Sequence, residues 1–138
     1  MSRCYWINEG IGVDSDTLLP HLDKHKCFLL VKKQLPDEEI SEDDFDLDDF
    51  FYGCPFENLG DFMCHADDSE VMTYGDNGDG VSYFLYPKSY PWHRHNNEPR
   101  SIAEVHNIII DSIQKVTNLS TEEADKLIDD DIYELGEG

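Results

Sequence analysis

The feature that most constrains this chain is a long stretch without positive charge. The 54 residues between Lys33 and Lys88 contain no Lys or Arg, yet they hold sixteen of the 31 acidic residues. Within them, residues 37–50, here called the acidic segment, contain nine acids in fourteen positions. Like charges at neighbouring helical positions destabilise a helix. This density therefore indicates that the segment serves something besides solubility.

The charge balance of the whole chain limits which partners it can bind. Ten basic residues against 31 acidic ones give a net charge of −21. Such a surface repels DNA, RNA and anionic membranes, and it attracts basic proteins. A second acidic region lies near the end of the chain, and basic residues gather elsewhere, so we expect one strongly negative side. The alternative is that the charge only keeps the protein soluble.

Length and composition predict one domain, residues 1–138, with a packed core. The chain is 39% hydrophobic and 12% aromatic, which is enough to build a core of this size. No apolar run approaches the roughly 20 residues that span a bilayer, and the first residues do not resemble a secretory signal. We therefore expect a cytoplasmic protein that contacts no membrane. Its cysteines are expected to be reduced and mostly buried. They are Cys4, Cys27, Cys54 and Cys64.

Hydrophobic patterning predicts an α+β fold with a small antiparallel sheet and about four short helices. Strands are expected at residues 3–8, 26–33, 70–74, 81–86 and 132–135, the third and fourth forming a hairpin around residues 76–80. A short helix is expected after Ser15, and others at residues 41–52 and 55–65. Ser101 and Ser120 each begin a capping box, which predicts two further helices. The first of these has an apolar stripe of Ile102, Val105, Ile109, Ile113 and Val116, with Ile108 beside it.

The acidic segment is the candidate partner-binding site. On a helix, residues three or four apart lie about 5–6 Å from each other. Successive phosphates on one nucleic acid strand rise about 3.4 Å along the axis, a comparable spacing. A basic cleft that binds DNA or RNA would therefore accept such rows of carboxylates. We expect Phe45, which falls on the acidic face, to act as an apolar anchor. The predicted contact residues are Glu39, Glu42, Asp43, Asp44, Phe45, Asp46, Asp48 and Asp49.

In charge, size and compactness the chain resembles small acidic inhibitors encoded by phages and other mobile elements, which block restriction or CRISPR nucleases. The resemblance rests on the acidic segment and on the acidic residues between 122 and 137. It implies a non-enzymatic inhibitor of a basic nucleic-acid-binding protein such as a nuclease. A second, shorter resemblance concerns Asp43-Asp44-Phe45-Asp46-Leu47-Asp48, which is similar to the activation segment of a herpesvirus transcriptional activator. That resemblance implies a segment that folds on its partner.

Other functions remain as alternatives, although no motif for them is complete. His93 and His95 with Cys54, Cys64 or His65 match the ligand types of zinc but not its usual spacing. Residues 76–80 resemble a calcium loop, but Pro87 stands where an EF-hand needs Glu. Cys/His nucleophile pairs can be drawn without any supporting motif. The sequence therefore predicts no catalytic residue, metal or cofactor. An ordinary protein-interaction module is the main alternative to an inhibitor.

Overall fold

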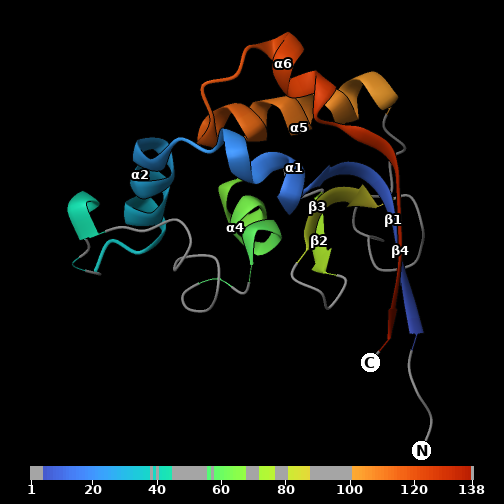
Figure 1. Cartoon of the computed structure of the whole chain (residues 1–138), viewed down its shortest axis with the longest axis horizontal. Helices are drawn as coiled ribbons and strands as arrows, with labels where there is room; N and C mark the ends of the chain where they lie inside the picture. Colours follow the sequence, from blue (N-terminus) through green and yellow to red (C-terminus); the bar gives the residue numbers. More distant parts are fainter. Residues whose placement is uncertain are drawn as a thin grey trace, which may run out of the picture.

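A computed structural model describes residues 5–37, 39, 41–44, 56, 58–67, 72–76, 81–87 and 101–137. It confirms a small α+β domain with an antiparallel sheet (Figure 1). The strands are β1 (Tyr5–Asp14), β2 (Thr73–Asp76), β3 (Ser82–Pro87) and β4 (Asp129–Glu137). The α-helices in the described ranges are α1 (Ser15–Leu18), α2 (Lys24–Gln34), α4 (Leu59–Ala66), α5 (Ile102–Val116) and α6 (Thr121–Lys126). Two short 3₁₀ turns are η1 (Leu19–His21) and η2 (Glu42–Asp44).

The sheet has the order β2-β3-β1-β4, and all of its pairs are antiparallel. The predicted hairpin is confirmed, because β2 pairs with β3 in the register Thr73 opposite Leu85. The predicted strand near the end of the chain is also confirmed, and it lies at the sheet edge beside β1. The first and last strands of the sheet are therefore neighbours, and β1 and β4 lie side by side in Figure 1.

Strand β1 continues well past the predicted end at residue 8, through Gly10 and Gly12. A Cβ atom on Gly12 would lie 2.0 Å from the carbonyl oxygen of Phe84, and one on Gly10 would lie 2.1 Å from that of Tyr86. No other residue type fits this close approach of two backbones. Glycine has a low strand propensity, so local pattern reading stops the strand before the point where tertiary contacts continue it.

Residues 26–33 were predicted as a strand, and this is wrong: they belong to helix α2. The carboxylate of Asp23 caps this helix by accepting a hydrogen bond from Lys26 N at 3.0 Å. The helix buries Cys27 and Val31, which are four residues apart, and leaves Leu29 52% exposed. A short continuous apolar run fits either a buried strand or a helix, and here the N-cap decides between them.

The main core lies between the sheet and the helices α1, α2, α4 and α5. It includes Val13, Phe62, Phe84, Ile109 and Ile113, each at most 1% exposed. Neighbouring residues of β3 alternate between faces, so a second, smaller cluster of Tyr83, Leu85 and Ile132 is separate from the main core. The sheet therefore buries apolar side chains on both faces.

The local signals at α5 and α6 predicted these helices well, whereas the helix predicted at residues 55–65 is present as α4 but begins only at Leu59, after the N-cap Asn58. Ser101 Oγ accepts from Glu104 N at 3.1 Å. Ser120 and Glu123 complete a reciprocal capping box, with bonds of 3.2 and 3.1 Å. One residue of the predicted stripe on α5 is wrong: Ile102 is 62% exposed, because it stands in the first turn, beyond the packed part of the helix. None of the described helices is long and apolar enough to cross a membrane.

Candidate partner-binding surfaces

The acidic segment does not begin as the predicted α-helix. Only residues 42–44 of its described part are helical, and they form the single 3₁₀ turn η2, so Glu39 and Asp43 are not placed on one α-helical row. Concentrated like charge disfavours a regular α-helix, which is a sufficient reason for this difference. Glu39 and Asp43 are exposed, and Glu42 is half-buried. The remaining predicted contacts, Phe45, Asp46, Asp48 and Asp49, lie outside the described residues, as does the rest of the predicted helix.

A histidine of α2 holds the η2 turn. His25 Nδ1 lies 2.6 Å from Glu42 Oε1, and the two side chains are 61% and 43% exposed. An exposed ion pair of this kind contributes little to stability. It nevertheless gives the acidic segment a fixed point of contact with the folded body, directly beside the predicted contact residues Asp43 and Asp44.

A second group of acids surrounds the junction of α6 and β4. All six side chains are exposed, and Lys126 is the only basic residue between the first and the last of them. In the described part of the chain, no Lys or Arg forms an ion pair with Glu122, Asp129 or Asp131. We call this group the C-terminal acidic surface. Its members are Glu122, Glu123, Asp125, Asp129, Asp130 and Asp131.

Two carboxylates of this surface are held by His106 of α5. Its Nδ1 lies 2.7 Å from Asp125 Oδ1 of α6, and its Nε2 is hydrogen-bonded to Asp130 Oδ1 of β4. The His106 side chain is 19% exposed. Partial burial alone would lower its pKa, but the hydrogen bonds and charges of the two aspartates together raise the pKa above its ordinary value.

Sequence reasoning missed this histidine, although one signal marks it. His106 stands four residues after Ile102 and three before Ile109, so it interrupts the apolar stripe of α5. A polar residue in that position needs a partner at the edge of the core. The partners come from α6 and β4, and only the tertiary structure brings them to the ring.

Two lysine side chains form hydrogen bonds to backbone carbonyl groups within the fold. The Lys26 ammonium group donates to the carbonyl oxygens of Gln114 and Thr117, at 3.2 and 2.5 Å, at the carboxyl end of α5. The Lys115 ammonium group donates to the carbonyl oxygen of Ala66, at 3.2 Å, at the end of α4. Cations stabilise helix carboxyl ends. These two lysines therefore stabilise helices and do not lie on either acidic surface.

We expected one strongly negative side, and this is wrong for the described residues. The described part of the acidic segment and the C-terminal acidic surface lie on different parts of the molecule. Figure 1 places η2, the teal turn beyond α2, at the left end of the long axis, whereas α6 lies at the top above α5 and β4 runs from there down the right side. Helix α2, with the exposed Lys24 and Lys33, lies between them. Regions distant in the sequence can lie on either side of a fold, and their charge alone does not decide which.

The Cys and His residues considered for zinc or nucleophilic chemistry are only partly described. Cys54, His93 and His95 lie outside the described residues, while Cys64 and His65 lie on α4. Burial, reinforced by Asp67 and Asp61, raises the pKa of Cys64 to about 12, and burial raises that of Cys27 to about 12. Both are free thiols, which stay protonated at neutral pH and are therefore poor nucleophiles. Among the described residues, no three Cys, His, Asp or Glu side chains are grouped to hold a metal.

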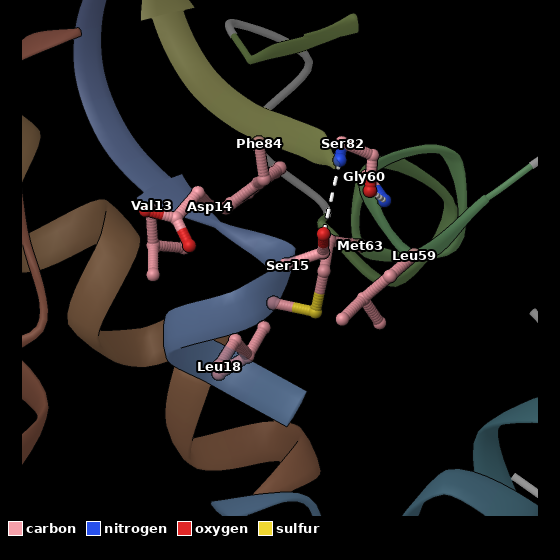
Figure 2. A pocket seen from close by; sticks show the side chains of 9 residues that line it. All are labelled: Val13, Asp14, Ser15, Leu18, Leu59, Gly60, Met63, Ser82 and Phe84. Atoms are coloured by element: carbon pink, nitrogen blue, oxygen red, sulfur yellow. Dashed lines mark hydrogen bonds between the residues drawn. The ribbon is translucent and has the colours of Figure 1, made fainter. Parts of the chain in front are cut away.

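A small hollow lies where β1, α1, α4 and β3 meet (Figure 2). Its lining is mostly apolar, with Asp14 as the one titratable residue. The Asp14 carboxylate caps α1 by accepting from Thr17 N at 2.7 Å, and Ser15 Oγ accepts from Ser82 N at 2.9 Å. These polar groups therefore join the elements to each other.

The loop at residues 76–80, which was considered as a calcium loop, is described only at Asp76, where β2 ends.

Comparison with known proteins adds no relative: no family model, no curated protein and no solved structure matches this chain.

Proposed function

We propose that this protein is a non-enzymatic, stoichiometric inhibitor. It presents carboxylates to the basic cleft of a nucleic-acid-binding protein, such as a nuclease, and competes there with DNA or RNA. The acidic segment and the C-terminal acidic surface are the contact regions. In the cytoplasm, where we expect it to act, such a protein would need no cofactor.

The observation that carries this proposal is the run Asp129, Asp130 and Asp131 at the exposed start of an edge strand. A strand rises about 3.3–3.4 Å per residue. Phosphates of one nucleic acid strand rise about 3.4 Å per nucleotide. Three successive aspartates on β4 therefore carry charge at the linear density of a phosphate backbone, although their side chains alternate between the two sides of the strand.

The aspartates also have a structural explanation. Charged side chains on an edge strand discourage pairing with the edge of another molecule, and three acids at the start of β4 have this effect. This explanation does not extend to Glu122, which is exposed on α6, or to Glu39 and Asp43 at the other end of the molecule. Acids on three separate elements favour a function of the charge itself.

A second candidate is a protein-interaction module that binds through apolar contacts. Leu29 and Ile102, which are 52% and 62% exposed, favour it. Isolated apolar side chains are common on protein surfaces, so this observation is the weaker of the two. The salt dependence of binding separates the candidates, because charge contacts weaken with ionic strength and apolar contacts do not.

Charge-neutralising variants test the contact regions separately. One variant carries Asp43→Asn, Asp46→Asn and Asp49→Asn; the other carries Glu122→Gln, Asp129→Asn and Asp131→Asn. We expect at least one of them to weaken binding to the nucleic-acid-binding partner by roughly tenfold or more, since loss of several charged contacts exceeds about 1.4 kcal/mol.

The matched control carries Asp16→Asn, Glu104→Gln and Asp111→Asn, three exposed acids outside both regions. It removes the same net charge, so equal weakening by this control would mean that only the overall field matters. Unchanged affinity in both test variants, each with an intact fold by circular dichroism, would exclude the proposed contact regions.

A further inference from the structure

His106 lies between two carboxylates that belong to different elements. Asp125 comes from α6 and faces Nδ1, while Asp130 comes from β4 and faces Nε2. These are the charged groups that α6 and β4 place against the ring, and both raise the pKa of His106. Helix α5 carries the histidine itself. One side chain thus connects three elements at the edge of the domain.

The chemistry of imidazole decides which protonation state fits this geometry. A neutral imidazole has one N–H and one lone pair, whereas an imidazolium has two N–H donors. Ionised carboxylates only accept hydrogen bonds. Both contacts of His106 can therefore be hydrogen bonds only when the ring is protonated. In the neutral ring, one lone pair would face a carboxylate oxygen, and that contact would be repulsive.

We propose that His106 is a protonation-dependent clasp that fastens α6 and the start of β4 to α5. Protonated, the ring donates to Asp125 and Asp130 together. Neutral, it keeps one of these bonds and releases the other carboxylate. The connection between α6 and β4 is only two residues long, Leu127 and Ile128, so release of either arm acts on the same junction.

The direction of the pH effect follows from the raised pKa. The clasp is fully formed below the ordinary histidine pKa of about 6.5. It is lost as the pH rises through the higher pKa of the folded state. Deprotonation also removes one positive charge beside the C-terminal acidic surface and ends the contact of one aspartate with the ring. The clasp does not depend on the proposed inhibitor function, because no partner takes part in it.

Nuclear magnetic resonance of the intact protein from pH 5.5 to 9 tests the clasp directly. Ring nitrogen shifts report whether His106 has two N–H groups, and amide hydrogen exchange reports how well β4 is held. We expect the ring to gain its second N–H with a midpoint above the ordinary histidine pKa of about 6.5. We also expect the protection factors of Asp131 and Ile132, corrected for intrinsic exchange, to fall roughly three- to tenfold as the ring titrates.

Substitutions separate the two arms. Asp125→Asn and Asp130→Asn should each lower the pKa of His106 and reduce the pH dependence of β4 protection. His25→Gln is the control, because His25 contacts Glu42 at the other end of the molecule and should leave β4 unchanged. A ring that titrates at or below the ordinary histidine pKa, or protection of β4 that stays constant while His106 titrates in the unmodified protein, would overturn the proposal.

Discussion

Ile102 and Ile113 lie on the same helix, α5, in opposite environments. Ile113 is fully buried in the main core, whereas Ile102 is 62% exposed in the first turn. The same side chain therefore contributes differently at the two positions, because apolar stabilisation scales with the surface removed from water. Residue type and spacing predicted that both side chains belong to one buried stripe. Only the packing of neighbouring elements determines which of the two is buried.

We expect Ile113→Ala to lower the free energy of unfolding by about 2–5 kcal/mol, since it leaves a cavity in a packed core. Ile102→Ala is the matched control on the same helix and should change it by less than about 0.5 kcal/mol. Urea denaturation followed by circular dichroism measures both. Equal destabilisation by the two substitutions would contradict the burial described for α5.

At the residue scale, the candidate site was only partly predictable. The exposed acids Glu39 and Asp43 follow from composition, because charged side chains are rarely buried. His106 and its two aspartates do not, since their contact joins positions up to 24 residues apart. Such a contact has no local pattern, and a sequence shows it only as a histidine standing within an apolar stripe.

Among the elements, those with explicit end signals were the most predictable. α5 and α6 begin at capping serines, and the hairpin of β2 and β3 surrounds a turn-forming sequence. These signals act within a few residues, so they depend less on distant contacts than an apolar pattern does. The second half of β1 has a weaker local signal, because its conformation depends on close backbone contact with β3. Helix α2 does begin at a capping residue, Asp23, but its short apolar run fits a strand as well as a helix.

Substitution of Lys26 tests whether α2 stabilises the carboxyl end of α5. The Lys26 ammonium group donates to two carbonyl oxygens at the carboxyl end of α5, so Lys26→Met should lower the free energy of unfolding by roughly 1–2 kcal/mol. Lys24→Met, on an exposed position of the same helix, is the control and should change it by less than about 0.5 kcal/mol. Thermal and urea unfolding measure both, and equal effects would show that the contact does not stabilise α5.

For the whole molecule, the sequence predicts how much charge there is but not where it lies. The net charge of −21 predicts a strong negative field. The fold then separates the acidic segment from the C-terminal acidic surface and places α2 between them (Figure 1). An inhibitor with this arrangement offers two separate contact regions. A single basic cleft would engage one region, while a longer basic channel or two partner molecules would engage both.

The most direct test of the inhibitor proposal is capture of binding proteins from a cell lysate on the immobilised chain. Capture is repeated with competing duplex DNA and at raised salt. We predict that basic nucleic-acid-binding proteins are retained, that duplex DNA displaces them, and that retention falls steeply as salt increases. A captured set that neither DNA nor salt displaces would contradict the proposal and would point to apolar recognition through side chains such as Leu29 and Ile102.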